Sequence, residues 1–165
     1  MVAPKTNAYS LIEAKPFSPH LGAEVYGVDL NETISDAQFA EILDAFLKYQ
    51  VLFFKNQKEI PPEQHVIFGK RFGPLHAHPA APTMEGHPEI FEIHATKDSK
   101  VANGEFWHSD VSCDDTPPLG TMLQIHIAPP YGGDTMFSNM EAAYDDLSDP
   151  MKKMLGGLTA LHSSE

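Results

Sequence analysis

Cysteine and long apolar runs are both scarce in this sequence. Cys113 is the single cysteine among 165 residues, so the chain cannot form an internal disulfide. A chain without disulfides is typical of reducing compartments, and the cytoplasm is the expected location. The run Val51–Phe54 is far too short to cross a bilayer, and no apolar segment follows the charge near Met1. We therefore expect no membrane span and no export signal.

Positive charge is scarce as well. The chain has 11 basic against 23 acidic residues, a formal net charge of -12 and a sequence pI near 5.0. Phosphate backbones and anionic membrane surfaces would be repelled by such a chain, which argues against a nucleic-acid or membrane partner. An anionic small molecule would have to be captured by local positive groups.

Apolar residues, in contrast, are plentiful. They make up 42% of the sequence, which is enough to bury a sizeable core and excludes general disorder. No internal repeat, low-complexity tract or obvious linker divides the chain. We therefore expect a single domain over residues 1–165, beginning with an extended, partly paired arm over 1–34 that has a short strand-like piece at 23–28.

Residues 35–73 are predicted to form a helix, a strand and a second helix. Ser35 and Gln38 have the spacing of a capping box, and five apolar residues then recur at helical intervals, which predicts an amphipathic helix over 36–48. The run at 51–54 is expected to be a buried strand. Pro61 and Pro62 are expected to open a second helix that stops at Gly73.

From residue 90 onward the pattern changes to short apolar or alternating runs separated by proline and glycine. These runs are residues 90–93, 106–111, 121–127 and 135–137, and their rhythm predicts a β-sandwich or barrel. Ser138 with Glu141 offers a second capping box, Pro150 can open one more short helix, and 158–162 is again strand-like. The predicted fold class is therefore mainly β with flanking helices.

The most informative short motif is Phe106-Trp-His-Ser-Asp-Val111. His108 and Asp110 are two residues apart in a strand-like run, so their side chains should project from the same face and could reach one ion. One imidazole and one carboxylate make two of the three ligands in the facial triad of iron(II) oxygenases. The pair alone is also compatible with a surface ion pair, a hydrogen-bonded turn or a zinc-dependent hydrolase.

The residues around this motif give it a context. Thr116-Pro-Pro-Leu-Gly120 follows it, and Tyr131-Gly-Gly-Asp-Thr135 follows that. Further matching motifs are Leu21-Gly-Ala-Glu-Val25, Gly27-Val-Asp-Leu30, Arg71-Phe-Gly73, His76-Ala-His-Pro79 and Glu141-Ala-Ala-Tyr144. In this order and spacing the sequence resembles the taurine dioxygenase family, and the resemblance covers essentially the whole chain.

The resemblance implies a double-stranded β-helix, also called a jelly roll, and an oxidative enzyme. It implies that His108 and Asp110 bind Fe(2+), that 2-oxoglutarate chelates this iron, and that the Thr135 hydroxyl donates to the distal carboxylate of 2-oxoglutarate. Molecular oxygen would then hydroxylate a small-molecule substrate, with release of succinate and carbon dioxide. The glycines before Thr135 permit the tight bend that this role requires.

The substrate positions of the family match this chain only in part. His78 and Val111 stand where the family contacts its substrate, but Ala81 and Gly104 replace a substrate-binding tyrosine and asparagine. Asn103, one residue before Gly104, could take the place of that asparagine. The resemblance thus implies a sulfonate, a sulfate ester or a carboxylate as substrate rather than taurine specifically.

The family's third metal ligand and its 2-oxoglutarate-binding arginine match no residue here. The chain is therefore expected to be the N-terminal portion of a longer dioxygenase with an incomplete jelly roll. A catalytically inactive truncated ligand-binding or assembly module of the same fold is the alternative. The sequence leaves the oligomeric state open, with a homo-oligomer among the options.

Overall fold

The computed structural model describes residues 9–77, 82–96, 98–99, 104 and 106–163. The chain divides into two compact units, the first comprising Met1–Ile60 and Ile125–Thr159 and the second comprising Pro61–Gln124 and Ala160–Glu165. The first unit is thus discontinuous in sequence, because most of the second unit lies between its two parts. No helix among the described residues is both long enough and apolar enough to span a membrane.

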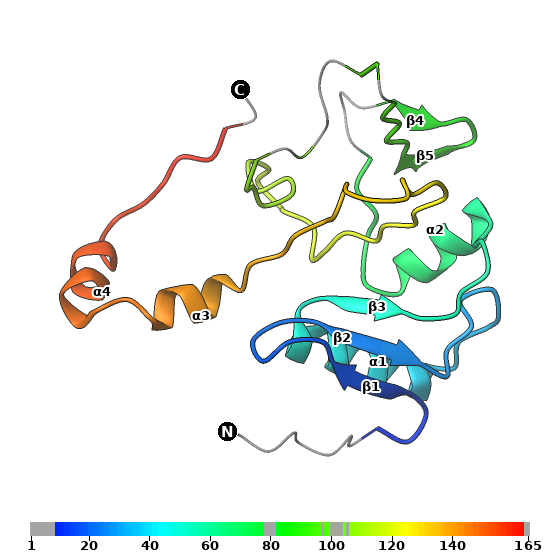
Figure 1. Ribbon diagram of the computed structural model, residues 1–165, viewed down its shortest axis with the longest axis horizontal. Coiled ribbons are helices and arrows are strands. Elements are labelled where there is room, and N and C mark those ends of the chain that lie inside the picture. The colour runs from blue at the N-terminus through cyan, green and yellow to red at the C-terminus, as the bar shows by residue number, and fades with distance from the viewer. Residues whose placement is uncertain (1–8, 78–81, 97, 100–103, 105, 164–165) are drawn as a thin grey trace. The chain divides into compact units, whose positions relative to one another are not determined.

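A three-stranded sheet forms the centre of the first unit (Figure 1). Strand β1 (Glu13–Pro16) pairs antiparallel with β2 (Ala23–Tyr26), and β2 pairs parallel with β3 (Leu52–Phe54). A parallel pair needs a long crossover connection, and helix α1 (Asp36–Tyr49) supplies it. The strands predicted near residues 23–28 and 51–54 are confirmed as β2 and β3, although β3 is half-buried rather than buried.

Helix α1 confirms the helix predicted over residues 36–48. The Ser35 hydroxyl caps it by accepting a hydrogen bond from the Gln38 backbone N–H at 3.2 Å. The Gln38 side chain does not complete a capping box, because its amide donates instead to the carbonyls of Leu11 and Gly27. The helix ends at Gln50, whose left-handed backbone (φ 65°) lets its N–H bond the Phe46 carbonyl.

The hydrophobic core of the first unit lies between α1 and the sheet. Val25 on β2 and Ile42 on α1 are both 0% exposed, and they are the largest fully buried side chains. Alternate residues of β2 are buried, as expected for a strand with one face against a helix. The other buried apolar residues of this unit are Ile12, Ala14, Ala23, Val28, Leu30, Ile34, Phe39, Ala45 and Ile60.

The Glu41 carboxylate on α1 binds the chain just before β1. It accepts hydrogen bonds from the backbone N–H groups of Ser10, Leu11 and Ile12 at 2.8–3.1 Å, and from the Ser10 hydroxyl at 2.8 Å. These bonds lower the pKa of Glu41 below its ordinary value, the Ser10 N–H contributing most. One side chain thereby satisfies three backbone donors that no strand pairs.

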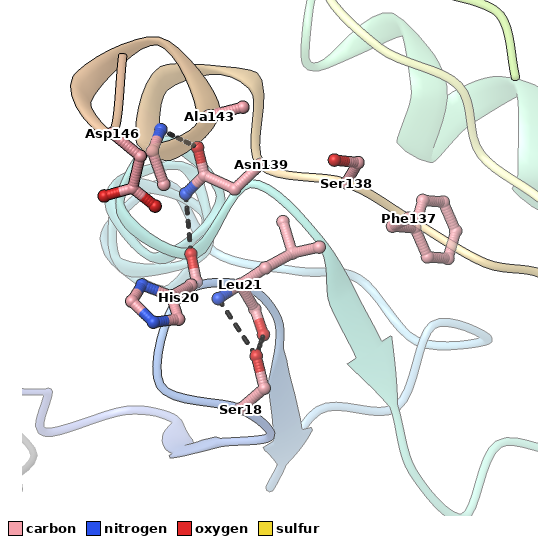
Figure 2. A pocket seen from close by; sticks show the side chains of 9 residues that line it. Ser18, His20, Leu21, Phe137, Ser138, Asn139, Ala143 and Asp146 are labelled. Atoms are coloured by element: carbon pink, nitrogen blue, oxygen red, sulfur yellow. Dashed lines mark hydrogen bonds between the residues drawn. The ribbon is translucent and has the colours of Figure 1, made fainter. Parts of the chain in front are cut away.

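Two short helices complete the first unit. Helix α3 (Met140–Asp145) begins after Asn139, whose side chain accepts from the Ala142 N–H at 2.9 Å. The cap had been expected one residue earlier, at Ser138, and that expectation is wrong. Asn139 can also donate to the His20 carbonyl at 2.6 Å, which links α3 to the turn between β1 and β2 (Figure 2). Helix α4 (Asp149–Leu155) has Pro150 in its first turn, which confirms the short helix expected there, and its C-cap is Gly156.

A pocket of about 330 Å³ lies between this turn and α3. Figure 2 shows Ser18, His20 and Leu21 on one side of it and Asn139 and Asp146 on the other. The hydrogen bond from Asn139 to His20 joins its two sides, and the Ser18 hydroxyl, which donates to the Leu21 carbonyl at 2.6 Å, fixes the turn. Two hydrogen bonds thus organise this junction within the first unit.

The second unit contains helix α2 (Pro62–Lys70) and a hairpin of β4 (Thr83–Met84) and β5 (His87–Phe91). The predicted opening of α2 at Pro61 and Pro62 is confirmed, and the helix ends three residues before Gly73. Gly86, with φ 80°, makes the tight turn of the hairpin. The runs predicted as strands from residue 90 onward are observed only in β5.

The other strand predictions do not agree with the structure. Among the described residues after Phe91, none is in a strand, including those of 106–111, 121–127, 135–137 and 158–162. A strand exists only if a neighbouring strand takes its backbone N–H and C=O groups, and these runs have no such neighbour within the described part of the chain. At 106–111 the backbone also turns, since Val111 has φ 50° and its carbonyl accepts from the Asp114 N–H.

Candidate metal centre

His108 and Asp110 lie in the second unit, at the start of the turn that contains Val111. The sequence pattern predicted that both side chains would project from one face of a strand. The structure brings the two side chains together, but it does so in a turn. His108 Nε2 lies 3.2 Å from Asp110 Oδ1, and the side chains are 55% and 51% exposed.

The imidazole of His108 is oriented by its own backbone. Nδ1 lies 2.7 Å from the Phe106 carbonyl oxygen, and a carbonyl can only accept, so Nδ1 carries the proton. In the neutral ring Nε2 then has the lone pair. A hydrogen bond of this kind, from one ring N–H to a backbone carbonyl, commonly fixes the orientation of a metal-binding histidine.

The carboxylate of Asp110 has one oxygen engaged and one that faces His108. Its Oδ2 accepts a hydrogen bond from the Thr121 hydroxyl at 2.7 Å. Its Oδ1 is the atom near His108 Nε2. The two groups thus present one nitrogen and one oxygen toward a common point.

The spacing of these two atoms fits a metal ion. With bonds of about 2.1 Å, the usual length for imidazole and carboxylate ligands, a separation of 3.2 Å corresponds to an angle of roughly 100° at the ion. This angle suits neighbouring positions of an octahedral or a tetrahedral ion. The pair therefore fits iron(II) and zinc alike, and the choice between them rests on other observations.

A proton can occupy the same place as the metal. The Phe106 carbonyl raises the pKa of His108 above its ordinary value and the Asp110 carboxylate adds to this effect, while partial burial opposes it. With a proton on each ring nitrogen, His108 and Asp110 form an exposed ion pair that contributes little to stability. A metal ion at Nε2 would therefore have to displace this proton.

The described residues bring two candidate donor atoms together at this place. No group of three histidine, cysteine, aspartate or glutamate side chains that could hold a metal is found within the described part of the chain. His162 and Ser112 lie close by in the same unit, with Nδ1 and the hydroxyl 2.8 Å apart, but they form no such group with the pair. A facial triad would need one further ligand.

The remaining residues expected at the site are distributed differently. Thr135 belongs to the first unit, where it is exposed and lies in an irregular segment. Gly132 and Gly133 have φ of 74° and 73°, so the backbone bend predicted before Thr135 is present. Val111 adjoins Asp110 directly, whereas His78 and Asn103 lie outside the described residues.

Sequence reasoning did not find the two groups that orient the pair. The Phe106 carbonyl is a backbone atom and has no signal in the sequence. Thr121 is 11 residues from Asp110, and a threonine at that distance is indistinguishable from an ordinary strand residue. The one signal in the sequence was position: Thr121 directly follows Gly120, the last residue of the motif that comes after His108 and Asp110.

The chain belongs to the family described as "Taurine catabolism dioxygenase TauD, TfdA family", which matches residues 13–165. The alkylsulfatase of Acinetobacter baylyi is 33% identical over 159 residues, which are 96% of this chain and 49% of that protein. The alpha-ketoglutarate-dependent sulfate ester dioxygenase of Pseudomonas putida is 30% identical over 154 residues, 93% of this chain and 50% of that protein.

The structural comparison agrees with the family assignment. The crystal structure of a taurine dioxygenase from Burkholderia xenovorans matches with a TM-score of 0.70 and 36% identity, covering 90% of this chain and 52% of that chain. The chain thus shares its arrangement of strands and helices with a taurine dioxygenase. It spans about half the length of the relatives that it matches.

Proposed function

We propose that a full-length protein containing this chain is an iron(II)- and 2-oxoglutarate-dependent dioxygenase. The observation that carries the proposal is the pairing of His108 Nε2 with Asp110 Oδ1 at 3.2 Å, each held by a further hydrogen bond. The pair alone suits zinc as well, and membership of the taurine dioxygenase family favours iron. His108 and Asp110 are the proposed metal ligands.

When bound, iron(II) supplies the oxidative chemistry that couples decarboxylation of 2-oxoglutarate to hydroxylation of the substrate. The protein positions the groups that would bind this ion. The Phe106 carbonyl keeps the proton on Nδ1 of His108 and so leaves Nε2 able to bind the metal. Asp110 adds one negative charge, which neutralises half of the charge of the ion. The third ligand and the arginine for 2-oxoglutarate are assigned to the part of the relatives' length that this chain does not span.

Thr135 is proposed to bind 2-oxoglutarate. Its hydroxyl can donate to an anion, and the positive φ angles of Gly132 and Gly133 bend the chain just before it. Its side chain is exposed in the first unit, as a residue that receives a ligand requires. Loss of this hydroxyl should raise the 2-oxoglutarate requirement more than it lowers the maximal rate.

The proposed substrate is a small anion, either a sulfate ester, a sulfonate or a carboxylate, and His78, Val111 and Asn103 are proposed to contact it. Two relatives are named for sulfate esters or alkyl sulfates. A Cβ atom on Gly104 would stand 3.6 Å from Cε1 of His108, so any larger side chain there would begin beside the metal ligand.

We propose that the complete domain of a full-length protein folds as a jelly roll. Apolar side chains alternate along the run at 121–127, and Leu123, Ile125 and Ile127 are 59%, 64% and 88% exposed. Such a segment becomes a strand when a neighbour pairs with it and covers its apolar face. We assign that neighbour to a full-length protein, which we place in the cytoplasm; a homo-oligomer is compatible with this fold.

The test is an anaerobic titration of the full-length protein with Fe(II) and 2-oxoglutarate, followed by addition of oxygen. We expect a visible charge-transfer band before oxygen is added, and oxygen-dependent succinate afterwards. Alkyl sulfates, alkyl sulfonates and carboxylates of equal chain length are then compared by the succinate that they elicit. The sulfate esters are expected to give the largest stimulation.

Three variants make this test specific. His108→Ala and Asp110→Ala should both lose the band, because each removes one of the two ligands. His94→Ala is the matched control, since His94 is an exposed histidine of the same unit that has no proposed role. A parent protein with neither band nor succinate would support the inactive alternative, and turnover with zinc in the absence of oxygen would indicate a hydrolase.

A further inference from the structure

The carboxylate of Asp110 is held at both oxygens by different partners. Oδ2 accepts from the Thr121 hydroxyl at 2.7 Å, while Oδ1 lies 3.2 Å from His108 Nε2. The distance from Thr121 is short, as expected for a hydrogen bond to a charged oxygen. The two oxygens of one group are thereby made unequal.

This inequality matters for an exposed carboxylate. The Asp110 side chain is 51% exposed, so little packing limits its rotation. A free carboxylate can turn either oxygen to a metal or offer both together. A donor fixed on Oδ2 leaves Oδ1 as the oxygen that faces the histidine, and threonine suits this task because its branched side chain has few rotamers.

We propose that Thr121 is a positioning residue of the metal centre, which holds Asp110 so that Oδ1 alone is presented to the ion beside His108 Nε2. The proposal rests on the proposed function, because it assumes that Asp110 is a metal ligand. Thr121 acts only through Asp110 and does not itself contact the metal. It completes a symmetrical arrangement, in which the Phe106 carbonyl orients His108 and the Thr121 hydroxyl orients Asp110.

A purely structural role for Thr121 makes a different prediction. The same hydrogen bond closes the chain between residues 110 and 121, so its loss could simply loosen the second unit. Such a loss would lower the melting temperature and leave the metal affinity of the folded protein unchanged. Loss of a positioning bond lowers the metal affinity of protein that is fully folded.

The test compares Thr121→Val with Thr121→Ser in the full-length protein. Valine keeps the shape of threonine and removes the hydroxyl, whereas serine keeps the hydroxyl. The Mn(II) dissociation constant is measured with Mn(II) alone, from the electron paramagnetic resonance signal of the free ion, at a temperature where circular dichroism shows each variant to be folded. Thr116→Val is the matched control, since Thr116 is an exposed threonine of the same unit.

We expect Thr121→Val to weaken Mn(II) binding by about 10- to 100-fold, the usual effect of removing an outer-shell partner. Thr121→Ser and Thr116→Val should bind Mn(II) as the parent does. Parent-like affinity of Thr121→Val, or equal weakening by Thr121→Ser, would overturn the positioning role. Asp110→Ala distinguishes failure of the positioning role from failure of the metal centre. If this variant binds Mn(II) like the parent, the proposed metal centre itself fails; if it loses Mn(II) binding, the metal centre stands.

Discussion

Residues 12–60 and residues 106–137 contain similar apolar patterns but have opposite structures. The first region forms three paired strands and a helix, with Val25 and Ile42 fully buried. Among the described residues of the second region there is no strand, and most of its large apolar side chains are exposed, Ile127 and Tyr131 at 88% each. A run with an apolar pattern thus forms a paired strand or a buried helix only where another segment of the chain packs against it.

The difference lies in where the backbone hydrogen bonds and the apolar surface find their partners. β2 finds β1 and β3 within 60 residues, and α1 covers the apolar side of the sheet. Each apolar side chain buried in this way contributes roughly 1.5–3 kcal/mol. The exposed apolar side chains of residues 106–137 do not stabilise the fold in this way. They form an apolar surface of the kind that another segment or another chain covers.

The sharpest test of this comparison is one apolar deletion in each region. Ile42→Ala should lower the free energy of unfolding of the 165-residue chain by about 2–5 kcal/mol, because it leaves a cavity in a closed core. Ile127→Ala should change it by less than about 0.5 kcal/mol, because that side chain already lies in water. Urea denaturation followed by circular dichroism measures both.

The contrast between Ile42→Ala and Ile127→Ala should disappear in a full-length protein. If a neighbouring strand covers residues 121–127 there, Ile127→Ala becomes a core deletion and should cost about 2–5 kcal/mol as well. An effect that stays below about 0.5 kcal/mol in both proteins would contradict the proposed covering strand. A large effect in the 165-residue chain would contradict the comparison itself.

A smaller effect is expected at the helix caps. Ser35→Ala should destabilise the chain by about 1 kcal/mol, because the Gln38 N–H loses its acceptor. Asn139→Ala should have a similar effect, while Ser138→Ala should be nearly neutral although the sequence pattern favoured it as the cap. Thermal denaturation of the three variants ranks them, and a larger loss for Ser138→Ala than for Asn139→Ala would refute the observed cap.

These caps show what the sequence could and could not predict. The Ser35 cap and the stripe that includes Ile42 are local, so residue spacing was sufficient to predict α1. Ser138 and Asn139 are both good capping residues, and the choice of Asn139 involves its second bond, to the His20 carbonyl 119 residues away. Spacing contains no information on such a partner.

The candidate metal centre was likewise predictable from the sequence only in part. The family motif pointed to His108 and Asp110, and their donor atoms do lie together, at 3.2 Å. The strand expected to bring them together is a turn instead, because Val111 has φ 50° and no neighbouring strand is present among the described residues. The bond from Thr121 could not be predicted, since it depends on the path of the intervening residues.

The smallest effect is expected from pH, at Glu41. Its pKa is lowered in the folded chain, so the charged form is favoured by folding and its contribution is complete above the ordinary pKa of 4.5. This contribution is lost as the pH falls through the lowered pKa. The stability difference between the parent and Glu41→Gln should therefore be constant near neutrality and shrink in acid.

Urea denaturation at a series of pH values from neutral to acid measures this difference. Glu32→Gln provides the control, because Glu32 is an exposed glutamate and the carboxylate that binds residues 10–12 is that of Glu41. A difference that grows as the pH falls would have the wrong sign for a carboxylate stabilised in its charged form. Such a result would contradict the role of the charged Glu41 carboxylate in holding residues 10–12.

The discontinuity of the first unit has a consequence for how the chain responds to a protease. Residues 61–124 are inserted between its two parts. Contacts between these parts among the described residues include Asn139 with His20, Gln50 with Glu141, and the edge-on rings of Phe53 and Phe137. A single cut within the insertion would break the covalent connection but none of these contacts. The two fragments of the first unit should then remain associated, as a complementing pair that separates only in denaturant.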